Sequence, residues 1–103
     1  MSNFEREREL VIDWMNTKQL IDNSTPLIQM EKMIEEVYEL EHEVRGQNRD
    51  TVEDELGDVL FTAVVQARMW NLDPTAALAR AVKKVTSRNG QMVKGLYVKE
   101  ADL

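Results

Sequence analysis

The sequence predicts an all-α protein of four helices arranged as a bundle or a close variant. Only four glycines and two prolines occur among 103 residues, whereas a turn-rich β protein needs many more of both. Each proline directly follows a residue that commonly caps helices, and apolar residues recur at helical spacing. Because this length supports one modest core, residues 1–103 are expected to form a single domain.

The first two helices are delimited by their apolar spacing and their caps. Residues 4–21 repeat apolar side chains one turn apart, which predicts the first helix. Thr25 followed by Pro26 is typical of an N-cap and a first helical position, because proline lacks only an N–H that has no partner there. The second helix is therefore predicted over residues 26–45, and Gly46 ends it.

Two further helices and a tail complete the predicted order. Asp50, followed three residues later by a glutamate, resembles a capping box and begins a third helix over residues 51–70. Asp73 before a proline repeats the capping device for a fourth helix over residues 75–88. Residues 89–103 are mixed in character, and we expect an extended tail or a short arm that packs on a partner.

Composition excludes several kinds of site. The chain has no cysteine and one histidine, so disulfides, thiolate zinc sites and sites that need two imidazoles from one chain are ruled out. A bound metal would be held by oxygen atoms. No apolar run approaches the roughly 18 residues of a membrane span, and the charged N-terminus is unlike a signal peptide. The expectation is a cytoplasmic protein without a membrane partner.

The net charge of −6 is unevenly distributed. Residues 1–79 carry seventeen acidic and seven basic side chains, whereas residues 80–103 carry six basic and two acidic ones. The overall negative charge disfavours nucleic acid as a partner. The chain therefore combines an acidic body with a basic C-terminal segment.

Clustered carboxylates on the second predicted helix are the first candidate site. Glu36 and Glu39 lie three residues apart beside the apolar face, and Glu35 lies one step further round. A solvated acidic face is the commoner interpretation of such a cluster. The density is nevertheless unusual, because six glutamates between residues 31 and 43 are accompanied only by Lys32.

The third predicted helix favours a binding site over a solvated acidic face, because this helix is apolar on both sides. Glu55 and Asp58 lie three residues apart on a face that should point into packed protein, and residues 59–67 contain no lysine or arginine. Two such pairs on neighbouring antiparallel helices form an oxygen cage for Mg²⁺, with Mn²⁺ as an alternative. Gly57, between the two acids, indicates either tight helix packing or the close approach of a ligand.

These motifs resemble those of the MazG-like family of all-α nucleoside triphosphate pyrophosphohydrolases. KMIEEVYEL (residues 32–40) and ELGDVLF (residues 55–61) resemble the family's EExxE and ExxD signature. KVTSR, from Lys84 to Arg88, resembles its phosphate-binding element. The resemblance spans residues 26–88. This chain has Val82 where members often have asparagine and Val85 where they have an aromatic residue.

The resemblance implies Mg²⁺-dependent hydrolysis of a nucleoside triphosphate between its α and β phosphates, in nucleotide pool clean-up. Glu35 would be a further acid, ligating a second ion or orienting water, and Lys32 would assist or pair with Glu35. The implied metal ligands are Glu36, Glu39, Glu55 and Asp58, and the implied phosphate-binding residues are Lys84 and Arg88.

Assembly and substrate are less closely defined. The two-sided third helix leaves apolar surface that a second copy would cover, and the family resemblance likewise implies a homodimer or homotetramer. Trp14 is a candidate for stacking a base, although core packing is the commoner role of tryptophan. Phosphoribosyl-ATP or dUTP is an alternative substrate, and a non-catalytic helical interaction module is an alternative of another class.

Overall fold

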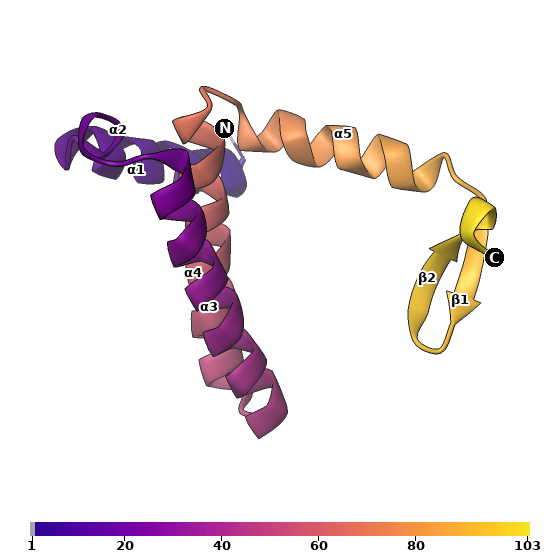
Figure 1. Ribbon diagram of the computed structural model, residues 1–103. Coiled ribbons are helices and arrows are strands. Elements are labelled where there is room, and N and C mark those ends of the chain that lie inside the picture. The colour runs from indigo at the N-terminus through magenta and orange to yellow at the C-terminus, as the bar shows by residue number, and fades with distance from the viewer. Residues whose placement is uncertain (1) are drawn as a thin grey trace.

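A computed structural model of the chain describes residues 2–103 and is mostly helical (Figure 1). This confirms the predicted all-α class. The elements are α1 (Asn3–Thr17), α2 (Leu20–Asn23), α3 (Pro26–Gly46), α4 (Arg49–Met69), α5 (Pro74–Thr86), β1 (Gly90–Val93), β2 (Leu96–Lys99) and the 3₁₀ turn η1 (Glu100–Asp102). No helix in the described part of the chain is long and apolar enough to cross a membrane.

The two longest helices, α3 and α4, run antiparallel and make the most extensive contact in the described chain (Figure 1). As predicted, the Thr25 hydroxyl caps α3 by accepting a hydrogen bond from the Ile28 amide at 3.1 Å, and Pro26 takes the first position. Gln47, at a φ of 58°, reverses the chain, and Asn48 then caps α4. A two-residue connection keeps the two helices side by side along their whole length.

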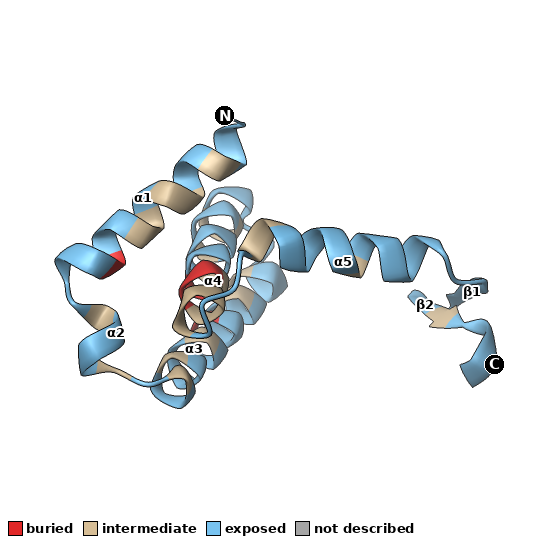
Figure 2. Ribbon diagram, turned by 90° about the horizontal axis from the view of Figure 1, so that it is seen from above, coloured by how far each residue is buried: buried red, intermediate tan, exposed pale blue. Residues whose placement is uncertain are grey.

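Helix α1 crosses α4 and closes a small core. Met15 of α1 is almost fully buried, and Val64 and Val65 of α4, which α1 contacts, are the other buried apolar residues in the described chain. The Trp14 ring meets Phe61 edge to face, with 5.1 Å between ring centroids. Figure 2 shows few buried residues, so the core is small and most of the helical surface is exposed or only partly covered.

Several predicted boundaries differ from the structure. The first predicted helix, residues 4–21, is two helices, because Gln19 adopts a left-handed φ of 53° that breaks the hydrogen-bond ladder. The third begins at Arg49 because Asn48, not Asp50, is its cap. The fourth predicted helix ends at Thr86 rather than at residue 88, and strand β1 begins four residues later at Gly90.

The bundle-like arrangement is only partly present, because α5 leaves the other helices. It contacts the end of α4 and then leads away from α3 and α4 (Figure 1). At its base, the Arg8 guanidinium donates to Asp73 and Thr75, both at 3.1 Å, which ties α1 to the start of α5. Leu78, Val82 and other apolar residues of α5 stay about half-exposed.

The predicted tail, residues 89–103, is a β-hairpin followed by a 3₁₀ turn. Gly90 pairs with Lys99 and Val93 with Leu96 in an antiparallel ladder. Lys94 and Gly95 form the turn with φ angles of 51° and 86°, the two positive values that a tight hairpin requires. The sequence signal was weak because lysine replaces the usual asparagine or aspartate before the glycine.

We predict that Gly90→Ala disrupts the hairpin. A Cβ at residue 90 would clash with the Val98 carbonyl oxygen and would lie 2.7 Å from the Tyr97 ring. Gly46→Ala is the matched control, because a Cβ there meets no atom within 4 Å. Hydrogen exchange should show lost amide protection over residues 90–99 in Gly90→Ala alone. Equal protection in both variants would contradict the tight packing at Gly90.

Candidate metal centre

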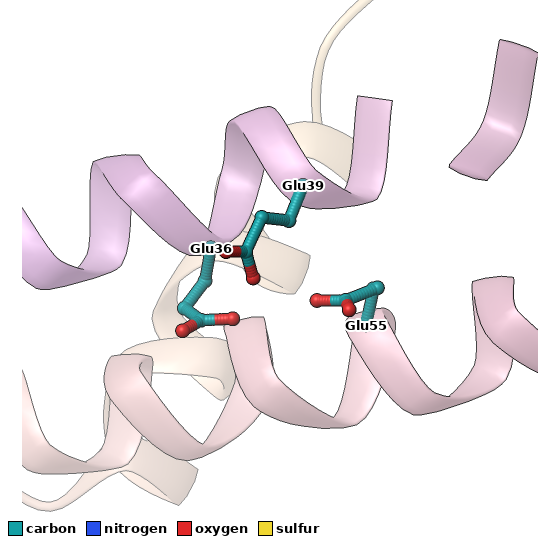
Figure 3. Close-up of side chains that lie close together, drawn as sticks. All are labelled: Glu36, Glu39 and Glu55. Atoms are coloured by element: carbon teal, nitrogen blue, oxygen red, sulfur yellow. The ribbon is translucent and has the colours of Figure 1, made fainter. Parts of the chain in front are cut away.

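Three carboxylates from two helices converge between α3 and α4 (Figure 3). Glu36 and Glu39 lie three residues apart on α3, and Glu55 faces them from α4. One oxygen from each group lies within 4.8 Å of the others. Carboxylate oxygens converging from separate elements are the donor set that hard divalent cations such as Mg²⁺ prefer.

Two oxygens of this cluster are buried without a partner. Glu36 is only 7% exposed; its Oε1 forms an ion pair with Lys32 Nζ at 3.0 Å, whereas its Oε2 has no hydrogen-bond partner in the described chain. Glu55 Oε2 is likewise buried and unpartnered. Buried carboxylate oxygens are normally satisfied, so these two atoms fit the coordination of a cation.

The electrostatics of the cluster show a deficit of positive charge. The Lys32 ammonium holds the pKa of Glu36 below its ordinary value. Hydrogen bonding to Glu36, reinforced by its negative charge, raises the pKa of Glu39. Burial, followed by repulsion from Glu39 and Asp58, raises the pKa of Glu55. One lysine therefore forms an ion pair with one of the three carboxylates, and the other two have no ion-pair partner among the residues that the structure describes.

Two predicted acids lie at the edge of this cluster. Asp58 is exposed and is not one of the three converging groups, so the expectation that it points into packed protein was wrong. It is still close enough to Glu55 to raise the pKa of that side chain. Glu35 is also exposed, and its Oε1 lies 3.7 Å from Lys32 Nζ. Pairing with Glu35 was one of the two roles expected of Lys32, and its Nζ also pairs with Glu36 at the shorter distance of 3.0 Å.

The predicted phosphate-binding residues lie on a different element. Lys84 is on α5, where it lines a shallow hollow with Arg80, Lys83 and Ser87. Arg88 follows the end of α5. Because α5 leads away from α3 and α4, the chain does not bring these cations to its own carboxylates (Figure 1).

Trp14 lines a groove of about 710 Å³ between α1 and α4. Trp14 is 40% exposed, and its ring packs on Phe61. Gly57 lies in the same groove, where an added Cβ would meet no atom within 4 Å. Tight helix packing within this chain therefore does not explain the glycine, and the groove at Gly57 remains open to a ligand or a second protein surface.

Fold and site together define a helical protein with a carboxylate site of the kind that binds a divalent cation. A family model for the MazG nucleotide pyrophosphohydrolase domain matches residues 24–93, and the chain belongs to this family. The matched range includes all of α3, α4 and α5, and so the three carboxylates, Lys84 and Arg88. Comparisons with curated proteins and with solved structures gave no match.

We predict that Glu55→Gln stabilises the metal-free protein at neutral pH. The raised pKa of Glu55 means that folding takes up protons, so this group destabilises the fold above its folded-state pKa. Its destabilising contribution disappears as pH falls towards the ordinary glutamate value of 4.5. Glutamine removes the charge and keeps the shape.

Thermal unfolding in the presence of a chelator tests this prediction. The melting temperature of Glu55→Gln should exceed that of the wild type at neutral pH, and the difference should shrink on mild acidification. Glu41→Gln, on the exposed side of α3, is the matched control and should show no such pH-dependent difference. A Glu55→Gln variant less stable than the wild type at neutral pH would contradict the electrostatic account.

Proposed function

We propose that the protein hydrolyses nucleoside triphosphates between the α and β phosphates in a Mg²⁺-dependent reaction, as part of nucleotide pool clean-up. The observation that carries this proposal is the pair of buried, unpartnered oxygens on Glu36 and Glu55. They occur within the MazG-matched range and at the positions of its acidic motifs. An acidic surface that served only solubility would leave its oxygens to water.

Glu36, Glu39 and Glu55 would hold Mg²⁺, and Asp58 would join them from the exposed edge. Mn²⁺ suits the same oxygen donors. When bound, the ion supplies charge stabilisation at the α-phosphoryl group and lowers the pKa of a water molecule. Among the described residues, Lys32 is the cation that pairs with this cluster, so the cluster keeps a net negative charge and has oxygen atoms that are free to coordinate an ion.

The remaining residues would position water and substrate. Glu35, exposed beside Lys32, would accept a proton from the attacking water as that oxygen bonds to the α phosphorus. The bond from the α phosphorus to the bridging oxygen then breaks, and pyrophosphate leaves with that oxygen. Lys84 and Arg88 would neutralise the charge on the leaving phosphates, and Trp14 is a candidate for stacking the base.

We further propose that the active form is a homodimer or homotetramer. The described chain buries few apolar residues but exposes many large ones, among them Leu27, Leu60 and Trp70. The open groove beside Trp14 adds to this exposed surface. A monomer rarely leaves so much apolar surface in contact with water, so association with a second copy supports the stability of the fold.

We predict that Mg²⁺ raises the melting temperature of the wild type. A ligand that binds only the folded state raises the free energy of unfolding by RT ln(1 + [L]/Kd). This is about 2.7 kcal/mol when the free ligand concentration is a hundred times Kd. Glu55→Gln should lose most of this shift, whereas the Glu41→Gln control should keep it. If Mg²⁺ leaves the wild-type melting temperature unchanged, the cage does not bind this ion.

We predict that wild-type protein with Mg²⁺ releases pyrophosphate from at least one common nucleoside triphosphate. Glu55→Gln and Asp58→Asn should each lower turnover by about a hundredfold or more, because electrostatic stabilisation of the transition state is lost. Glu41→Gln should keep wild-type turnover. No pyrophosphate from a panel of the common ribo- and deoxyribonucleotides, or full turnover by Asp58→Asn, would contradict the proposal.

A further inference from the structure

Helix α5 meets the other helices at its base and then leads away from them (Figure 1). Leu78 and Val82, further along α5, are about half-exposed. Lys84 lies ten residues beyond Pro74, which is about 15 Å along the helix at about 1.5 Å per residue. A rotation of α5 by about 20° at its base would therefore displace Lys84 by about 5 Å. The contacts at the base thus decide the direction in which α5 presents Lys84 and Arg88.

The backbone of the connection from α4 to α5 fixes only part of this direction. Asn71 adopts a left-handed φ of 54°, and the Leu72 amide donates to the Ala67 carbonyl at 2.8 Å, which closes the end of α4. Asp73 then caps α5 by accepting a hydrogen bond from the Thr75 amide at 2.9 Å. In the described chain, no backbone hydrogen bond joins the turn that ends α4 to the cap that begins α5. Side chains must therefore hold the two parts together.

A side chain of α1 supplies this contact. The Arg8 guanidinium donates from Nη1 to Asp73 Oδ1 and to Thr75 Oγ1, both at 3.1 Å. Its Nη2 donates to Glu9 Oε1 at 3.0 Å, which fixes the orientation of the planar group. Asp73 is the N-cap of α5 and Thr75 lies in its first turn, so Arg8 joins α1 to the start of α5. We call the contacts of Arg8 with Asp73 and Thr75 the Arg8 clamp.

The Arg8 clamp is partly shielded from water. The Arg8 side chain is 17% exposed and lines a cavity of about 190 Å³ at the junction of α1, α4 and α5. A hydrogen bond from the Thr75 amide, aided by the charge of Arg8, holds the pKa of Asp73 below its ordinary value. Arg68 lines the same cavity, but Arg8 is the cation that pairs with Asp73 among the described residues. A charged hydrogen bond in this setting is stronger than one between neutral groups.

We propose that Arg8 is a positioning residue: by fixing the first turn of α5 to α1, it sets the direction in which α5 presents Lys84 and Arg88 to the phosphates of the substrate. This inference rests on the proposed function for the roles of Lys84 and Arg88. Arg8 lies on α1, outside residues 24–93, so the family match assigns it no role. Helix α1 would thus act on the reaction through the base of α5.

Distance measurements between spin labels test the clamp without activity. The chain has no cysteine, so Glu41→Cys on α3 and Ala79→Cys on α5 give two labelling sites, both exposed. Labelled chains are diluted with unlabelled chains of the same variant, so that the distance within one chain is measured. With Arg8 present the labels should give a narrow distance distribution, which Arg8→Ala should broaden because α5 then moves about its base. Arg6→Ala removes an exposed arginine of the same helix and is the matched control that should keep the narrow distribution.

Steady-state kinetics test the effect of the clamp on the reaction. With a nucleotide that the wild type cleaves, Arg8→Ala should lower kcat/KM about tenfold, because the phosphate-binding residues are misplaced. The rise in melting temperature with Mg²⁺ should keep its wild-type size, because the carboxylates are unchanged. The loss should be smaller in a Lys84→Ala background, since part of what Arg8 positions is then absent. A residue that only stabilises the fold would cost the same factor in both backgrounds.

Thr75 offers a milder change that keeps the α5 cap. Thr75→Val removes the hydroxyl that Arg8 contacts, so it should broaden the distance distribution and lower kcat/KM less than Arg8→Ala does. Thr75→Ser keeps the hydroxyl and should retain wild-type values. This pair of variants decides the question even where Arg8→Ala does not fold.

The two readouts separate the clamp from the proposed function. A narrow distance distribution in both Arg8→Ala and Thr75→Val would overturn the clamp and leave the proposed function standing. An equal loss of kcat/KM in the wild-type and Lys84→Ala backgrounds would overturn the positioning role. Broadened distributions in a protein that cleaves no nucleotide would support the clamp and overturn the proposed function.

Discussion

The antiparallel packing of α3 against α4 is the interaction on which the rest of this structure depends. It brings Glu55 opposite Glu36 and Glu39, and it removes two of their oxygens from water. Taking carboxylates out of water while they repel one another is unfavourable, and Lys32 offsets this for Glu36 alone. The carboxylates between the two helices therefore carry uncompensated negative charge, which a bound cation would neutralise.

The same constraint accounts for the distribution of apolar surface. Helix α4 packs on α3 along one side and contributes Val64 and Val65 to the core with α1, yet much of its apolar surface stays exposed beside the groove at Gly57. A chain of this length cannot bury a helix that is apolar on both sides. The surface that stabilises the acidic cage and the surface that would bind a second copy are thus parts of one helix.

Local chemistry explains what could be predicted. The caps at Thr25 and Asp73 were predicted because their side-chain oxygens accept from amides two or three residues ahead, a contact that needs no tertiary partner. The cluster at Glu36, Glu39 and Glu55 was predictable because i, i+3 spacing and an antiparallel hairpin leave little geometric choice. The break at Gln19 and the turn at Lys94 escaped prediction, since neither residue type favours a positive φ.

By itself the sequence determined the helical class, the caps at Thr25 and Asp73, the MazG membership carried by residues 24–93 and the separation of charge between the body and the C-terminal segment. Only the tertiary structure decided that Asp58 is exposed while Glu36 is buried, because burial depends on which face the neighbouring helix covers. It also decided that α5 extends away from the carboxylates. An amphipathic pattern specifies that a helix has an apolar face, but the partner of that face is set by packing between elements distant in sequence or between chains.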